Sequence, residues 1–137
     1  MKKIFLLLLT ICLFLTGCFG LNKSKDEDKK EENTNIEKIS YSKLNEIVNN
    51  YSEHSNIDVI DVRSEELFDE SHIKGAINVP YDNISDIIIS LDREIIVYSS
   101  TSMKSRQAAQ ELIELGYKNV KYITGFDNWP YEVEKNR

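Results

Sequence analysis

Cysteine is almost absent from this chain, because both of its copies, Cys12 and Cys18, lie within the first eighteen residues. The rest of the chain holds no thiol, which excludes a disulfide framework and a cysteine-based metal site there. Histidine is equally scarce. His54 and His72 stand eighteen positions apart, with no H-x-x-x-H or C-x-x-C spacing around them. We therefore expect neither a metal centre nor another cofactor.

Basic residues are also in short supply. The chain has 17 lysines and arginines against 23 acidic residues, a net charge of −6. Without Lys2 and Lys3, 15 basic residues would face 23 acidic ones, and the charge would fall to about −8. Such a surface repels phosphate backbones, and no basic stripe interleaved with aromatics is present, so we do not expect nucleic-acid binding. Hydrophobic residues make up 41% of the 137 positions, enough for one domain with a core.

No apolar run reaches the roughly 20 residues that a bilayer-spanning helix needs. A shorter run at residues 4–15 follows Lys2 and Lys3, as is typical of a signal peptide. It ends in Leu15-Thr16-Gly17-Cys18, which closely resembles a bacterial lipobox. The resemblance implies a signal peptide over residues 1–17 and a diacylglyceryl group on Cys18, with palmitate-type chains holding the protein on the extracytoplasmic face of the cell membrane. The alternative is an ordinary secretory signal with an incidental cysteine.

The next segment, residues 18–35, begins with the lipidated cysteine and continues as a polar stretch with charges of both signs. It has too few apolar residues to bury a face, so we expect a disordered tether that holds the folded domain clear of the lipid headgroups. The domain itself is predicted to occupy residues 36–137.

Within that domain, short apolar runs alternate with longer periodic stretches. The short runs predict strands at 38–40, 57–62, 76–79, 95–98 and 120–123. The periodic stretches predict helices at 41–50, 64–68, 84–91 and 103–115, and a closing helix or turn at 126–135. This alternation predicts an α/β fold in which a parallel sheet of about five short strands has helices on both faces. Sheets of this kind bind ligands at the carboxyl ends of their strands.

Four stretches, in order, resemble the rhodanese-like (sulfurtransferase-like) family. They match its D-V-R motif, its G-H-I-x-G-A-x-N-I-P motif, its strand with the active loop, and its G-G-x-x-x-W motif, at residues 61–63, 71–80, 97–106 and 124–129. Ser71 stands where the second motif usually has glycine. The resemblance implies a rhodanese-like fold from about residue 36 to residue 135.

The active loop is the part of the resemblance that concerns catalysis. In active members it reads C-x-x-x-x-R followed by Ser or Thr. The cysteine carries sulfur, and backbone N–H groups of the loop and the next helix form an anion cradle. The loop keeps its length and its terminal cation, with Lys104 in place of arginine, but a serine stands at the nucleophile position. The aligned residues are Ser99, Ser100, Thr101, Ser102, Met103, Lys104 and Ser105.

Serine is not a conservative replacement at this position. A thiol with a pKa of about 8.5 becomes a thiolate beside a helix N-terminus and a cation, whereas an alkanol stays protonated there. A serine nucleophile needs a general base, and no histidine lies near Ser99 in the sequence. We therefore expect no catalytic residue in this loop. Its hydroxyls and Lys104 would suit a small oxyanion or a partner's carboxylate, or the hydroxyls simply cap the helix and satisfy the loop backbone.

Five further residues belong to the matching motifs. Asp61 and Arg63 are expected to stabilise a strand end by hydrogen bonds and a salt bridge, the alternative being a substrate-binding pair. His72 is interpreted as a structural hydrogen-bonding residue, with pH sensing or ligand binding as the alternative. Gly75 is expected in a turn, and Trp129 as a core anchor for the last element.

Three functions are compatible with these residues. The first is a membrane-tethered, catalytically silent domain that binds an oxyanion or a protein partner. The second is an active sulfurtransferase or hydrolase that works through Ser99 or with an external thiol, and it requires a histidine within hydrogen-bond reach of Ser99. The third is a structural lipoprotein without a ligand.

Overall fold

The structure is a computed structural model that describes residues 35–136. The predicted signal peptide, the predicted lipobox with Cys18 and nearly all of the predicted tether lie outside the described residues. None of the helices within 35–136 has the length and apolar character needed to cross a bilayer.

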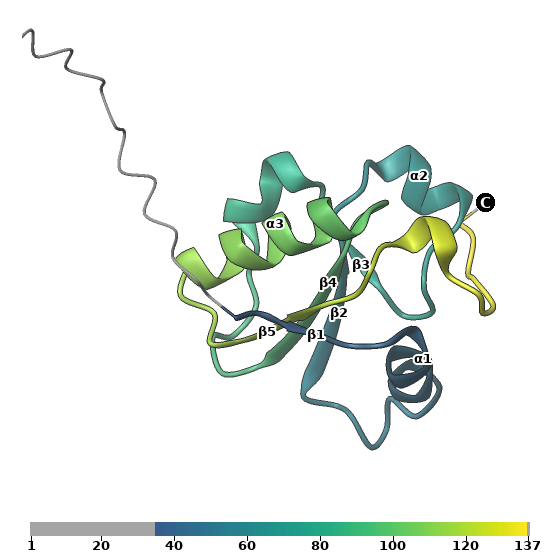
Figure 1. The fold of residues 1–137 in the computed structure, drawn as a ribbon, viewed down its shortest axis with the longest axis horizontal. Helices are drawn as coiled ribbons and strands as arrows, with labels where there is room; N and C mark the ends of the chain where they lie inside the picture. Colours follow the sequence, from purple (N-terminus) through teal and green to yellow (C-terminus); the bar gives the residue numbers. More distant parts are fainter. Residues whose placement is uncertain (1–34, 137) are drawn as a thin grey trace, which may run out of the picture. The chain divides into compact units, whose positions relative to one another are not determined.

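Five parallel strands form one sheet in the order β1-β5-β4-β2-β3 (Figure 1). Their bounds are β1 Glu37–Lys38, β2 Ile57–Asp61, β3 Ile77–Asn78, β4 Glu94–Tyr98 and β5 Asn119–Tyr122. The central pair is in register from Ile57 opposite Glu94 to Asp61 opposite Tyr98. Because all the strands are parallel, their carboxyl ends lie at one edge of the sheet.

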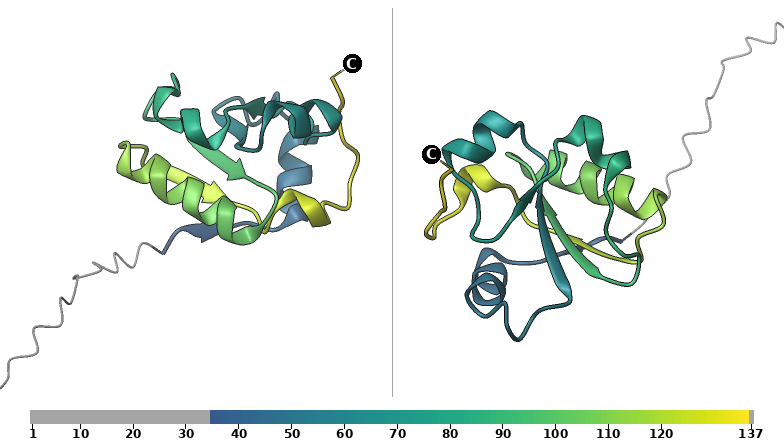
Figure 2. Two further views of the ribbon diagram at one scale, coloured as in Figure 1. Left: turned by 90° about the horizontal axis from the view of Figure 1, so that it is seen from above. Right: turned by 180° about the vertical axis from the view of Figure 1, so that it is seen from behind.

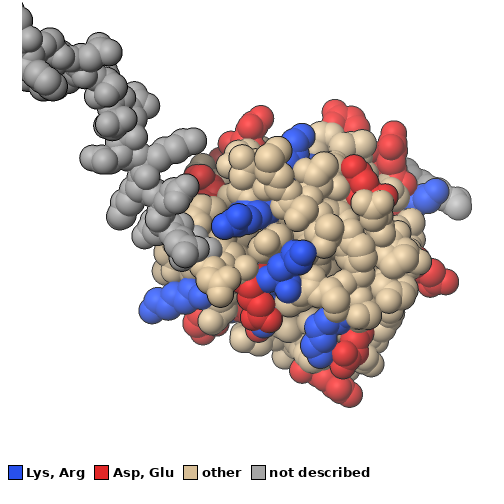
Figure 3. All heavy atoms as spheres, viewed as in Figure 1, with Lys and Arg blue, Asp and Glu red and all other residues tan. Residues whose placement is uncertain are grey.

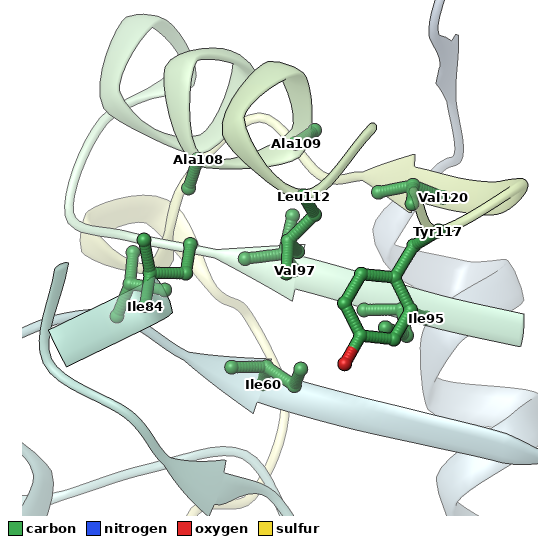
Figure 4. Packing of buried hydrophobic residues seen from close by; sticks show 10 residues of the cluster. Ile60, Ile84, Ile95, Val97, Ala108, Ala109, Leu112, Tyr117 and Val120 are labelled. Atoms are coloured by element: carbon green, nitrogen blue, oxygen red, sulfur yellow. The ribbon is translucent and has the colours of Figure 1, made fainter. Parts of the chain in front are cut away.

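Strand β4 has no exposed surface from Ile95 to Tyr98, because both of its faces are covered. Its alternate side chains belong to two cores. Ile95 and Val97 face one core, while Ile96 and Tyr98 face the other. Figure 4 shows the first core, in which Ile84 and Tyr117 pack with side chains of strands β2, β4 and β5 and of the helix that carries Leu112.

Helices cover both faces of the sheet, as Figures 1 and 2 show from three directions. On one face α1 (Tyr41–Asn49) buries Leu44, Ile47 and Val48. On the other face α3 (Ser102–Glu114) buries Ala108, Ala109 and Leu112. A short helix α2 (Glu65–Glu70) follows β2, and two 3-10 helices, η1 (Tyr81–Asp86) and η2 (Phe126–Asn128), follow β3 and β5. The predicted α/β fold with about five parallel strands and two helical layers is confirmed.

The helix predicted at 84–91 is wrong. The chain forms the 3-10 helix η1 up to Asp86 and then runs extended, with ψ of 129° at Ile87. Ile87 and Ile89 pack against the core while Ile88 is 99% exposed, an alternation typical of extended chain rather than of a helix. Three consecutive isoleucines disfavour a helix, because branched side chains lose rotamer freedom there.

At 126–135, where the sequence predicts a closing helix or turn, the structure has a single short 3-10 turn. Only Phe126–Asn128 is helical. The chain then passes Pro130 and runs beside residue 72, where Glu134 forms an antiparallel bridge with His72 through two backbone hydrogen bonds of 2.9 and 2.8 Å. Elsewhere the predicted element bounds differ from the observed ones by a few residues at most.

Candidate functional site: the cavity at the carboxyl edge of the sheet

A cavity of about 300 Å³ opens at the carboxyl edge of the sheet. Its walls come from the segments after β2 and β4, from α2 and η1, and from the first turns of α3. The lining residues are Val62, Arg63, Ser64, Leu67, Tyr81, Ser99, Ser100, Lys104 and Gln107. This is the edge at which the sequence predicted ligand binding.

Ser99 directly follows β4 and is only 6% exposed. Its backbone N–H donates to Ser105 Oγ at 2.9 Å, and its carbonyl accepts from the Phe126 N–H at 2.8 Å. Among residues 35–136 its hydroxyl has no hydrogen-bond partner, and Ser99 lines the cavity. The hydroxyl is therefore available to whatever occupies the cavity.

Two of the loop hydroxyls serve the protein backbone. Ser105 Oγ donates to the Thr101 carbonyl at 2.9 Å and also receives the Ser99 N–H. Thr101 is the N-cap of α3, and its Oγ1 accepts the Lys104 N–H at 3.4 Å. The interpretation that loop hydroxyls cap the helix therefore describes Thr101 and Ser105, and it leaves Ser99, Ser100 and Ser102 without such a role.

The backbone N–H groups of Ser100, Thr101, Ser102 and Met103 have no acceptor within the described part of the chain. They form the loop and first turn of α3, a 13-residue helix, where the helix dipole favours negative charge. Of these four residues only Ser100 lines the cavity, beside Ser99, so the N–H donors without acceptors extend from the cavity wall into the first turn of α3.

Lys104 is the cation of this site that forms no ion pair within residues 35–136, whereas Arg63 is paired with Asp61. Lys104 is exposed and lines the cavity, whereas Arg106 is exposed but does not line it. Met103, 68% exposed, also does not line the cavity. Lys104 therefore supplies the positive charge that the aligned arginine would supply in an active member of the resembled family.

Asp61 and Arg63 form a buried ion pair beside the cavity. Arg63 Nη2 lies 2.6 Å from Asp61 Oδ2, and Arg63 Nε donates to both carboxylate oxygens at 3.0 Å. The guanidinium also donates to the Ser71 carbonyl at 2.7 Å and lies 4.0 Å from the Phe126 ring centroid. Burial alone would lower the pKa of Arg63, but hydrogen bonds and charge from Asp61 raise it. The pair ties together the end of β2, the segment before β3, and η2.

Tyr98 lies beneath this ion pair at the end of β4. Its hydroxyl accepts the Ile73 N–H at 3.1 Å. Burial, followed by the charge of Asp61, raises the pKa of Tyr98 far above its usual value. The phenol is therefore a neutral structural group, not an acid available to the cavity.

His72 does not reach Ser99. Its Nδ1 lies 2.8 Å from the Phe68 carbonyl oxygen, and its Nε2 lies 3.7 Å from Glu134 Oε2. The imidazole stacks on the Phe68 ring with centroids 3.8 Å apart. His54 precedes β2, at the opposite edge of the sheet from the cavity. No histidine of the described chain can act as a base for Ser99.

The other two motif residues lie away from the cavity lining. Gly75 has a φ of +69°, and a Cβ there would lie 2.5 Å from the Tyr51 ring, so both conformation and space require glycine. Trp129 is half-buried against the second core, packs edge-on against Tyr41 and Tyr131, and donates to the Glu132 carbonyl at 3.3 Å. It follows a 3-10 turn, so it does not anchor a closing helix.

The family follows from comparison with known proteins. The sequence pattern of the rhodanese-like domain matches residues 43–130, more than half of the chain. The chain belongs to the rhodanese-like domain family.

Its relatives include sulfurtransferases. It is 31% identical to the thiosulfate sulfurtransferase GlpE of Shewanella oneidensis over 81 residues, covering 57% of this chain and 80% of that protein. It is 30% identical over 102 residues to the adenylyltransferase and sulfurtransferase UBA4 of Meyerozyma guilliermondii. That match covers 65% of this chain, which spans about a quarter of the fungal protein, 24% of its length.

Solved structures share the fold. A rhodanese from E. coli, solved with anions, has a TM-score of 0.52 and 28% identity, covering 58% of this chain and 98% of that one. The Alr3790 protein of Anabaena has a TM-score of 0.65 at 22% identity, covering 71% of this chain and 82% of its own. The five-stranded sheet with its helices is thus the rhodanese-like fold.

The rhodanese-like domain also has cavity residues that the sequence analysis missed. Apart from the loop and Arg63, the walls come from Val62, Ser64, Leu67, Tyr81 and Gln107. Tyr81 follows the end of β3 and Ser64 the end of β2, so position after a strand is the signal that could have identified these two. Leu67 and Tyr81 are 41% and 43% exposed at the cavity, which gives it an apolar side.

The distribution of charged and metal-binding side chains limits the kinds of ligand that the domain can bind. Within residues 35–136 no group of three His, Cys, Asp or Glu side chains is placed to hold a metal ion. On the face shown in Figure 3, basic and acidic side chains are interspersed, and no continuous basic stripe crosses it. The donors gathered in the cavity are those that an anion would use.

Proposed function

We propose that this protein is a membrane-anchored lipoprotein whose rhodanese-like domain binds an anionic group in the cavity and does not transfer sulfur. The observation that carries the proposal is the environment of Ser99. Ser99 lines the cavity at the nucleophile position beside Ser100, whose N–H has no acceptor in the described chain, and no histidine of residues 35–136 lies within reach of its hydroxyl.

The chemistry of oxygen argues against sulfur transfer. The helix N-terminus and Lys104 favour an anion at this position, but they are too weak to ionise an alkanol, whose pKa lies far above that of a thiol. Serine nucleophiles depend on an adjacent base oriented by a third group, and both histidines have other partners or lie elsewhere. An oxygen at position 99 also cannot form a persulfide.

The same arrangement supports binding. The Ser99 hydroxyl, the Ser100 N–H and the Lys104 ammonium belong to residues that line the cavity and can donate to one oxyanion, and donors of this kind hold sulfate or phosphate at helix N-termini. A cavity of about 300 Å³ with Leu67 and Tyr81 on its walls is larger than a bare sulfate. It therefore suits an anionic group carried on a larger molecule, including a protein partner.

The anchoring part of the proposal rests on the lipobox at Leu15-Thr16-Gly17-Cys18. Two acyl chains on Cys18 would keep the domain on the membrane, because each buried CH2 contributes about 0.8 kcal/mol. Metabolic labelling with palmitate, compared between the natural chain and Cys18→Ser, tests this part by itself.

The first experiment measures sulfur transfer from thiosulfate to cyanide by the chain without residues 1–17. We expect no turnover by the natural protein and a clear gain in Ser99→Cys. The gain should be on the order of 1,000-fold or more, since deleting a catalytic nucleophile costs at least that much elsewhere. Turnover by the natural protein would contradict the proposed inactivity. Silence of both proteins would mean that the loop has lost the family's cradle geometry, and would favour a structural role.

Anion binding is tested by calorimetry with thiosulfate, sulfate and phosphate. Lys104→Ala should weaken binding about tenfold, the equivalent of one charge-assisted hydrogen bond. Arg106→Ala is the matched control, because Arg106 is an exposed cation of the same helix that does not line the cavity. Equal loss in both variants would show that only general surface charge is involved.

A further inference from the structure

Three exposed apolar side chains gather at the end of the domain away from the cavity. Ile88 is 99% exposed, Leu91 is 50% exposed and Leu115 is 38% exposed. Below, these three residues are called the apolar end patch. The Leu91 side chain lies beside Gly116, the residue after Leu115, because a Cβ on Gly116 would lie 3.9 Å from Leu91 Cδ2.

The patch is held in place by Tyr117. Its hydroxyl donates to the carbonyls of Ile87 at 3.4 Å and Ile89 at 3.1 Å, which ties residues 87–89 to the segment after α3. Ile87 and Ile89 pack against the core, so Ile88 between them must point outward. Folding places no requirement for an apolar residue at position 88. A fully exposed isoleucine beside two exposed leucines therefore points to a surface that meets something apolar.

The topology places the patch opposite the cavity. The amino ends of the strands are aligned at one edge, with Ile57 opposite Glu94 and Glu94 opposite Asn119. Leu91 lies just before β4, and Leu115 just after α3, which runs back along the sheet to this edge. The cavity lies at the carboxyl edge, so the two surfaces face away from each other.

The chain also enters the domain at the patch end. The described residues begin at Asn35, which lines a hollow together with Ile113, Lys118 and Asn119 at the amino edge. Strand β1 starts directly afterwards, with Glu37 opposite Lys121. Residues 19–34 lie between Cys18 and this point, and a polar linker of that length spans roughly 20–25 Å. A lipid anchor on Cys18 would thus be joined to the end of the domain that carries the patch.

We propose that the apolar end patch rests on the interface of the lipid bilayer, and that this contact turns the cavity away from the membrane. The proposal rests on the membrane anchor of the proposed function and is independent of what the cavity binds. Residues Asp92, Glu114 and Lys118 flank the patch with charges of both signs. The contact is therefore driven by apolar insertion and does not require anionic lipids.

The test uses the chain from Cys18 to Arg137, in which Cys18 is the sole thiol and Trp129 the sole tryptophan. The Cys18 thiol is coupled to maleimide lipids in phosphatidylcholine vesicles whose acyl chains are brominated, and tryptophan quenching reports contact with lipid. Two further proteins carry Trp129→Phe together with Ile88→Trp or Met103→Trp. Met103 is the matched control, because it is exposed at the other end of α3.

Tryptophan at position 88 should lose most of its emission in brominated vesicles relative to unbrominated ones. Tryptophan at position 103 and the natural Trp129 should keep theirs. Adding Leu91→Asp to the Ile88→Trp protein should restore the emission, because it places a charge in the contact. Equal quenching at 88 and 103, or none at 88, would overturn the proposal.

Two other outcomes distinguish membrane docking from the proposed lipid anchor and from dimerisation through the same patch. In the vesicle experiment the chain is coupled chemically, so the result does not depend on acylation in cells. Quenching at position 88 would therefore support the docking surface even if palmitate labelling showed that Cys18 is not acylated. That labelling result would contradict only the proposed lipid anchor. Sedimentation of the uncoupled chain detects the competing occupant, a second copy of the protein. A dimer that Leu91→Asp dissociates, without quenching on vesicles, would overturn membrane docking.

Discussion

At the scale of single residues, the wall of the cavity depends on one buried charge pair. Arg63 and Asp61 are 6% and 0% exposed, and each satisfies the other through hydrogen bonds that water cannot replace. The Asn78 amide closes the same turn by donating to the carbonyls of Asp61 and Arg63 at 3.1 and 3.0 Å. These contacts fix the backbone that leads from β2 into the cavity lining.

Asp61→Asn should therefore be strongly destabilising. It leaves the Arg63 cation buried without its carboxylate, and breaking such a pair costs about 3–5 kcal/mol of unfolding free energy. Asp58→Asn is the control, because it breaks the more exposed pair between Asp58 and Arg93 and should cost at most about 1 kcal/mol. Urea unfolding of both variants measures the difference. Similar costs would show that burial does not distinguish the two pairs.

At the scale of elements, the loop after β4 is shaped by the segment that packs on it. Gly125 has a φ of +129°, and a Cβ there would lie 2.5 Å from the Ser100 carbonyl oxygen and 2.7 Å from Thr101 Cα. The N–H groups of Phe126 and Asp127 then donate to the carbonyls of Ser99 and Ser100. With these carbonyls occupied by η2, the loop N–H groups are the polar backbone groups left for a ligand.

Gly125→Ala tests this coupling between η2 and the loop. The backbone conformation alone should cost about 1–3 kcal/mol, and the clash with Ser100 should add to that and weaken anion binding. Gly116→Ala is the control, because Gly116 also has a positive φ, of +101°, but the nearest atom to its Cβ is 3.9 Å away. It should lose stability without losing anion affinity. Thermal melts and calorimetry on both variants provide the comparison.

At the scale of the whole molecule, two phenols, the half-buried Tyr51 and the buried Tyr98, make stability depend on alkaline pH. Burial, followed by the charges of Asp58 and Glu134, raises the pKa of Tyr51 from 10 to about 12. Tyr98 is shifted in the same direction by burial and Asp61. Both phenols are held neutral in the fold, while the unfolded chain ionises near pH 10. Their contribution is thus complete below pH 10 and is lost as pH rises through the folded values.

Urea unfolding should therefore show stability falling from pH 10 toward pH 12. Tyr51→Phe should reduce that fall, because phenylalanine has no proton to lose, and it sacrifices only the long 3.4 Å hydrogen bond to the Lys74 carbonyl. The comparison is made between the slopes of the two proteins above pH 10. Identical slopes would contradict a role for Tyr51 in alkaline unfolding.

The order and type of most elements could be predicted from the sequence. The run Ile95–Tyr98 predicts a doubly covered strand because no polar residue interrupts it, and the spacing of Ala108 and Leu112 predicts the helix that covers one side. The run from Ile84 to Leu91 misled the same reasoning. Its isoleucines are spaced as on one face of a helix. The extended chain at Ile87–Ile89 is instead stabilised by hydrogen bonds from Tyr117 and by packing against the core, which local periodicity cannot predict.

What the sequence by itself determined is the chemistry available at position 99: an oxygen instead of a sulfur, in a chain that has no thiol after Cys18. It also determined the family motifs and the alternation of strands and helices, because these follow from residue types at short separations. Only the tertiary structure decided which groups meet. It directs His72 to Phe68 and Glu134, brings Leu67 and Tyr81 to the cavity, and leaves the Ser99 hydroxyl without a partner among the described residues. Such contacts join residues far apart in the chain, so they depend on how the parallel strands are ordered and covered.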